Sequence, residues 1–152
     1  QATYLYRYCT KGFALGVNGV VVMEGNRPAA HVMYDGGSEW SIGAAEDVNG
    51  NGTSEVVLYN SEQHQGMAFW GATVIDISGG HVTPFGYFDL GEENDGMAAR
   101  VRRRLAYRIL VAGGASPVFY RESYRWQGGR WVPHGKATPF TPQKAHAEFQ
   151  VL

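Results

Sequence analysis

The sequence predicts an all-β domain of antiparallel hairpins with little helix. Two observations carry that prediction: short runs rich in Val, Ile, Tyr, Phe and Trp recur along the 152 residues, and 21 glycines and six prolines punctuate them. Apolar runs bounded by turn residues are typical of strands, and double glycines such as Gly79-Gly80 supply the positive φ of tight hairpins. We expect a propeller-blade-like partial sheet, or a small sandwich or barrel.

The expected strands, in chain order, cover residues 4–8, 13–17, 19–23, 30–34, 40–44, 55–59, 71–77, 82–90, 104–111, 118–126 and 130–132. The turn residues that separate them include Asn18-Gly19, Gly25-Asn26, Gly113-Gly114 and Gly128-Gly129. Residues 97–111 also contain good helix formers. However, Leu105, Tyr107 and Ile109 lie two apart, which is the strand period. We therefore expect a strand from Arg104.

The length fits a single β-rich domain over residues 1–152, either complete or a fragment or mature part of a longer protein. No apolar run approaches the ~18 residues of a membrane span, so we expect none. The single cysteine, Cys9, excludes a disulfide within the chain. Because the chain begins at Gln1 without a signal-peptide pattern, we expect an exported, periplasmic or extracellular protein that has lost a leader, with a cytoplasmic protein as the alternative.

Charge is divided unevenly along the chain. Residues 1–96 carry a net charge of −9 and residues 97–152 a net charge of +8, which leaves −1 overall. Opposite charges on neighbouring strands stabilise a sheet, so we expect the basic last third to dock on the acidic first part. The alternative is a polyanion-binding strand, with nucleic acid the less expected ligand. Its residues would be four arginines on one strand face: Arg100, Arg102, Arg104 and Arg108.

The most specific motif lies at residues 45–58, with the sequence AEDVNGNGTSEVVL. Oxygen-bearing side chains recur at residues 47, 49, 51 and 55, and Gly52 permits a sharp turn. Calcium binds six to eight hard oxygens at about 2.3–2.6 Å, and this spacing folds such oxygens around one point. The expected metal ligands are Asp47, Asn49, Asn51, Thr53 (through its carbonyl) and Glu55. The alternative is an ion-free turn of residues that tolerate positive φ.

The motif is not an EF-hand, because Leu58 stands where the twelfth, acidic ligand would be and an apolar run follows the loop. In this strand–loop–strand setting, residues 43–60 resemble the FG-GAP or VCBS repeat family. The remainder is similar only in its general pattern of short apolar runs separated by turns. The resemblance implies a β-propeller-like blade with a structural calcium loop in an adhesion-type module. The family usually has aspartates where this chain has Asn49 and Asn51, so we expect weak calcium binding, in the range of about 10⁻⁴–10⁻³ M.

These observations favour a non-catalytic domain that binds a protein or glycan partner. Aromatic side chains at the rim of the sheet could contact that partner, and at least half of them are expected in the core: Tyr34, Trp40, Trp70, Trp126 and Trp131. The alternative is a hydrolase with a carboxylate site that the sequence does not localise. Glu92, Glu93 and Asp95 form an acidic segment between glycines, but an acid–base pair must face across ~5–9.5 Å. We therefore assign no catalytic residue.

Overall fold

The computed structural model describes residues 2–8, 17–35, 40–94, 102–145 and 149–151. These residues form twelve strands and no helix: β1 (Ala2–Tyr8), β2 (Val17–Glu24), β3 (Arg27–Asp35), β4 (Trp40–Ala44), β5 (Val56–His64), β6 (Met67–Ser78), β7 (His81–Asn94), β8 (Arg104–Ala112), β9 (Val118–Gln127), β10 (Arg130–Pro133), β11 (Thr138–Phe140) and β12 (Phe149–Val151). The predicted all-β class is confirmed. Within these ranges, no helix has the length and apolar character needed to span a membrane.

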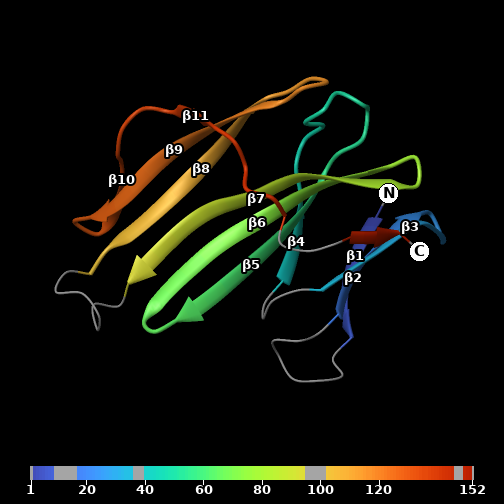
Figure 1. Ribbon diagram of the computed structural model, residues 1–152, viewed down its shortest axis with the longest axis horizontal. Helices are drawn as coiled ribbons and strands as arrows, with labels where there is room; N and C mark the ends of the chain where they lie inside the picture. Colours follow the sequence, from blue (N-terminus) through green and yellow to red (C-terminus); the bar gives the residue numbers. More distant parts are fainter. Residues whose placement is uncertain (1, 9–16, 36–39, 95–101, 146–148, 152) are drawn as a thin grey trace.

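The strands form two antiparallel sheets. The smaller sheet has the order β1-β2-β3-β12, and the larger has the order β10-β9-β8-β7-β6-β5-β4, with β11 also paired to β9. Figure 1 shows the larger sheet as a long curved surface, with the smaller sheet beside its β4–β7 side. The larger sheet is not closed into a barrel, so the barrel alternative is wrong. Hairpin connections explain the antiparallel pairing, because short turns reverse the chain.

Tight turns join the longest strands. Gly79 and Gly80, with φ of 56° and 76°, connect β6 to β7 as the double glycine predicted. Gln65 and Gly66, with φ of 48° and 79°, connect β5 to β6. Two successive left-handed residues suit a hairpin turn whose twist matches its strands. Because glutamine is an unusual residue for such a turn, the sequence did not predict it, and β5 extends to His64, beyond the expected end at residue 59.

The smaller sheet differs from its predicted form at β2 and β12. Asn18-Gly19 is not a turn but lies inside β2, where Gly19 pairs with Tyr6 on one side and Met33 on the other. Ladder bonds on both sides keep this segment extended. The expected strand at residues 13–17 lies outside the described residues except for Val17. The three-residue strands β11 and β12 were not predicted, because so short a segment shows no periodicity.

Residues 56–58 of β5 and residues 71–76 of β6 are largely buried, and these parts of the two strands are covered on both faces. On one face, Leu58 and Ile75 pack with Val20 and Tyr34 of the smaller sheet. On the other face, Val74 packs against a second cluster whose buried members are Val48, Phe88 and Phe119. A strand covered on both faces needs a continuous apolar run rather than alternation, which explains the Val56-Val57-Leu58 sequence. The central strands therefore hold both cores together.

Replacing Leu58 with alanine tests the importance of this central strand. Leu58 has no exposed surface, so L58A should lower the free energy of unfolding by about 2–5 kcal/mol through lost burial and a residual cavity. Urea denaturation measures the change. The matched control is Val118→Ala, where the side chain is 47% exposed and the expected loss is below about 1 kcal/mol. Equal losses in both variants would contradict a core centred on β5.

Candidate functional site

The loop at residues 47–55, which connects β4 to β5, is organised around one carboxylate. Asp47 Oδ1 accepts the backbone N–H groups of Gly50 at 2.7 Å and Asn51 at 3.0 Å. Its Oδ2 accepts the N–H of Gly52 at 2.8 Å. Gly50 and Gly52 have φ of 75° and 88°, a conformation that favours glycine. These bonds hold the chain wrapped around Asp47.

Two asparagines connect this loop to β6. The Nδ2 atoms of Asn49 and Asn51 donate to Asp76 Oδ2 at 3.2 and 2.9 Å, and the Ser78 hydroxyl donates to the same oxygen at 2.9 Å. Asp76 is only 5% exposed. It is absent from the predicted ligand set because it lies 27 and 25 residues from its two partners. The sequence signal that could have found it is an acid inside the apolar run at residues 73–77.

Glu55 is fully buried beside this connection. Its Oε2 accepts the N–H of Val48 at 2.8 Å, whereas its Oε1 has no hydrogen-bond partner among the described residues. The buried Oδ1 of Asp76 is without a partner in the same part of the chain. Val56 pairs with Ile75, so Glu55 and Asp76 are the next residues along two adjacent strands. Two buried carboxylates therefore lie near each other at the base of the loop, one directly before β5 and one in β6.

The cluster has the chemistry of a hard-cation site but not the form of a ready metal cage. Among the described residues, no Lys, Arg or His forms an ion pair with Glu55 or Asp76. Burial of carboxylates without a compensating charge is costly. However, no three His, Cys, Asp or Glu side chains in the described ranges are grouped for a metal. The side-chain oxygens instead accept bonds within the loop: Asn49 Oδ1 from the Asn51 N–H, and Asn51 Oδ1 from the N–H and hydroxyl of Thr53.

The predicted ligands thus divide into two groups. Hydrogen bonds join Asp47, Asn49, Asn51 and Thr53 in one network. Glu55 lies apart from them, bonded to the backbone of Val48. Val48 also connects the loop to the β8–β9 hairpin, because its carbonyl accepts the N–H of Gly114 at 3.0 Å. The loop, which connects β4 to β5, therefore also contacts β6 and the β8–β9 hairpin.

The basic segment before and within β8 is paired with acids of β7. Arg102 Nη2 and Arg104 Nε both contact Glu93 Oε1 at 2.6 Å, and Arg103 Nη2 lies 3.4 Å from Glu92 Oε1. The hydrogen bond from Arg102, together with that from Arg104, lowers the pKa of Glu93 below its usual 4.5. A general acid in glycoside hydrolysis needs a raised pKa instead. These pairs join the basic last third of the chain to the acidic first part.

Glu92 and Glu93 do not lie in an acidic loop, as the hydrolase alternative assumed, but in β7, where Glu93 pairs with Arg104 in the strand register. Asp95 and Arg100 lie outside the described residues. Arg108 pairs with Glu122 of β9, its Nε 2.7 Å from Oε2, so this contact is internal to the last third of the chain. A polyanion-binding role for the arginines stays a prediction.

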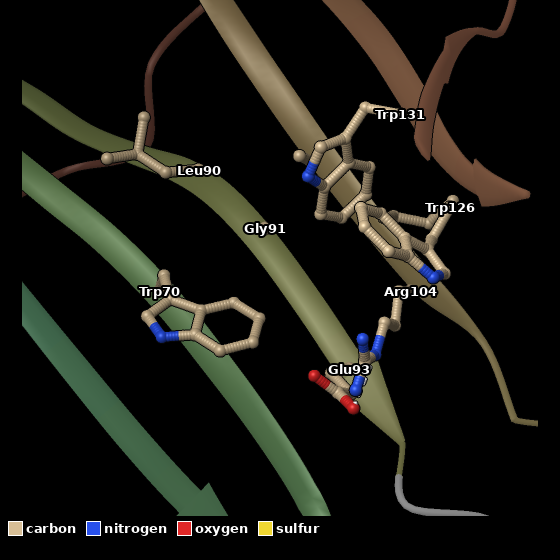
Figure 2. Close-up of a pocket in the computed structure, with 9 residues that line it drawn as sticks. Trp70, Leu90, Gly91, Glu93, Arg104, Trp126 and Trp131 are labelled. Carbon is tan, nitrogen blue, oxygen red and sulfur yellow. Dashed lines mark hydrogen bonds and ion pairs between the residues drawn. The ribbon is translucent and has the colours of Figure 1, made fainter. Parts of the chain in front are cut away.

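A groove with a volume of about 410 Å³ lies on the larger sheet between aromatic walls (Figure 2). We call it the tryptophan groove. Trp70 of β6 stands on one side, and Trp126 of β9 and Trp131 of β10 stand on the other. Trp126 and Trp131 are opposite each other in the register, with ring centroids 5.3 Å apart and planes at 74°. Gly91 and Ala106, which pair across β7 and β8, lie between the walls.

These three tryptophans are the exposed members of the predicted rim aromatics, at 39%, 39% and 44% exposure. Tyr34 belongs to the core instead, where it is 2% exposed and packs against Phe149. The side chain of Trp40 lies outside the described part. The sequence alone did not reveal that the tryptophans surround one groove, because strands distant along the chain supply its two sides.

A second cavity, of about 420 Å³, is lined mostly by aliphatic and aromatic side chains such as Val57, Phe88 and Ile109. The ionisable groups along it are Tyr59, Tyr107 and Arg108. Burial raises the pKa of the Tyr107 hydroxyl. The described residues that line this cavity include no carboxylate, histidine or cysteine.

Comparison with known proteins identified no relative: no family model matches the chain, and neither a curated protein nor a solved structure matches it significantly. The resemblance to the FG-GAP or VCBS family therefore stays a prediction. Function has to be argued from the geometry of the loop and the groove.

The ion pairs of Glu93 predict that part of the folding stability is lost at acidic pH. Because the pKa of Glu93 is lowered in the folded chain, its stabilising effect is complete above the unfolded pKa and is lost as the pH falls through the folded value. The difference in urea midpoint between the parent chain and Glu93→Gln should therefore shrink as the pH falls below the usual carboxyl pKa of 4.5. Glu62→Gln, at an acid whose only described ion pair is a 3.7 Å contact with His64, is the control. A difference that stays constant with pH would contradict the assignment.

Proposed function

We propose that this chain is a non-catalytic, exported β-sheet domain that acts in binding, with the 47–55 loop stabilised by one calcium ion. The observation that carries the proposal is the pair of buried carboxylates, Glu55 and Asp76, each with one oxygen that accepts no hydrogen bond from the described residues. A cation beside them would supply the compensating charge that no described basic side chain provides.

The residues that would hold this ion are all oxygen donors: Asp47, Asn49, Asn51, the carbonyl of Thr53, Glu55 and, from β6, Asp76. A set made only of oxygens suits calcium rather than zinc, which prefers nitrogen and sulfur. Asn49 and Asn51 lower the expected calcium affinity because they carry no charge. Asp76, a third carboxylate, partly restores it. The expected affinity, near about 10⁻⁴–10⁻³ M, suits a protein outside the cell.

Rotation of the Asn49 and Asn51 side-chain amides could convert the loop from an ion-free to an ion-bound form. Their amide nitrogens now donate to Asp76 Oδ2, which partly compensates its charge. An amide exchanges its nitrogen and oxygen when its last side-chain bond turns by half a rotation. Asn49 and Asn51 could therefore present oxygens on the side of Asp76 when a cation takes over the charge compensation.

Binding, rather than catalysis, is supported by the ionisable groups of the two cavities. Glu93 is the one carboxylate among the described residues that line either cavity. Its pKa is lowered by Arg102 and Arg104, so it stays ionised and paired at neutral pH. Acid–base chemistry needs a second group with a different pKa, and the exposed tryptophans suit contact with a partner instead.

Calcium should raise the melting temperature of the protein. For a dissociation constant near 1 mM, about 10 mM calcium contributes roughly 1.4 kcal/mol, or about 3–5 °C for a chain of this size. Differential scanning calorimetry with added CaCl₂ measures the shift. Asp76→Asn should abolish most of it, since it removes a charged ligand without changing the side-chain volume.

The matched control is Glu46→Gln, at an exposed acid that directly precedes the loop and should leave the calcium response unchanged. MgCl₂ at the same concentration controls for ionic strength and should produce a smaller shift, because magnesium requires a stricter octahedral shell. A melting temperature that does not respond to calcium would overturn the ion proposal. The ion-free turn would then be the correct interpretation.

A further inference from the structure

We propose that the tryptophan groove binds a neutral oligosaccharide, whose sugar rings lie against Trp70 on one side and against the Trp126–Trp131 pair on the other. The groove is a different surface from the cation loop and needs no ion. Trp70 lies near the beginning of β6, whereas Asp76 lies near its end. The proposal rests on the general binding role argued above, and it adds the class of ligand and the place where that ligand is held.

The walls of the groove are large aromatic faces that water can reach. Exposed apolar patches of this kind mark binding sites on soluble proteins, because leaving them in water is unfavourable. The carbon–hydrogen faces of a pyranose ring are flat and apolar, so they can lie against an indole ring. Trp70 stands across the groove from Trp126 and Trp131, as Figure 2 shows, so an oligosaccharide lying in the groove can place sugar rings against both walls.

The floor of the groove is open because two small residues lie there. Gly91 pairs with Trp70 on β6 and with Ala106 on β8, so a row of three strands carries one large side chain and two small ones. A Cβ atom at Gly91 would lie only 2.8 Å from the Leu105 carbonyl oxygen and 3.3 Å from the Trp70 ring. Glycine at this position therefore preserves both the strand pairing and the space between the walls.

One end of the groove carries paired polar groups. Glu93 offers carboxylate oxygens that accept hydrogen bonds, and Arg104 offers N–H groups that donate them. Both lie at the same end in Figure 2, with Arg104 Nε 2.6 Å from Glu93 Oε1. Sugar hydroxyls donate and accept at once, so neighbouring hydroxyls can bond to both members of this pair. Apolar walls with a few polar groups at one end are typical of small-molecule sites.

The charges around the groove favour a neutral ligand. A cationic ligand would compete with Arg104, whose guanidinium carbon already lies 5.8 Å from the centre of the Trp126 ring. A nucleic-acid strand also stacks on aromatic rings, but it needs cations that are free to neutralise phosphates. Arg102, Arg103 and Arg104 are each paired with Glu92 or Glu93. A neutral carbohydrate needs neither an unpaired carboxylate nor an unpaired arginine in the site.

Tryptophan fluorescence tests this proposal directly, because the groove contains three of the four tryptophans of the chain. The intact protein is titrated with the hexasaccharides of β-1,4-linked glucose, N-acetylglucosamine, xylose and mannose, and with a ten-residue oligothymidylate. We expect a saturable change with at least one hexasaccharide. Trp70→Ala and Trp126→Ala should each weaken its affinity by about tenfold or more, as for other ligands that stack on aromatic rings.

The matched control is Phe69→Ala. Phe69 precedes Trp70 on β6 and is similarly exposed, but it does not line the groove, so its removal should leave the affinity unchanged. Urea midpoints establish that each variant is folded. No response to any hexasaccharide, binding of the oligothymidylate alone, or equal losses in the Phe69 and Trp70 variants would overturn the proposal. Titrations repeated in excess EDTA should keep the affinity, which separates the groove from the calcium proposal.

Discussion

The burial of Glu55 is the constraint on which much of the larger sheet depends. Its carboxylate accepts the N–H of Val48, and the carbonyl of Val48 accepts the N–H of Gly114 at the far hairpin. The Val48 side chain packs with Phe88 and Phe119 in the second core cluster. One loop therefore joins the β4 edge, the central strands and the β8–β9 hairpin. An ionised carboxylate is costly to bury without a compensating charge, and this cost connects the fold to the cation proposal.

The two faces of the central strands have different partners, and this difference creates the groove. The smaller sheet covers one face of β5 and β6, where Leu58 and Ile75 are completely buried. The other face lies on the concave side of the larger sheet, where Val74 and Phe88 belong to the second core cluster. This cluster covers only part of that face. Farther along β6, β7 and β8, outside this cluster, the residues on β7 and β8 are the small Gly91 and Ala106. The space that they leave lies between exposed tryptophans instead of inside a core.

Charge acts locally in this molecule rather than between two halves. The net charges of −9 and +8 suggested that the last third docks on the first part, and the contacts of Glu92 and Glu93 with Arg102, Arg103 and Arg104 support this over one strand pair. Arg108 and Glu122, in contrast, pair within the last third. Opposed side chains on adjacent strands come close enough to interact, whereas averages over long segments do not predict which residues meet.

The sequence by itself determined the features that depend on neighbours along the chain. Apolar periodicity and glycine pairs predicted the strands from β5 to β10, and the spacing from Asp47 to Glu55 identified the loop, because both reflect local backbone geometry. Only the tertiary structure decided that Asp76 meets Asn49 and Asn51, and that three tryptophans surround Gly91. These contacts depend on strand order and register, which a sequence pattern does not specify until both faces of each strand have found their partners.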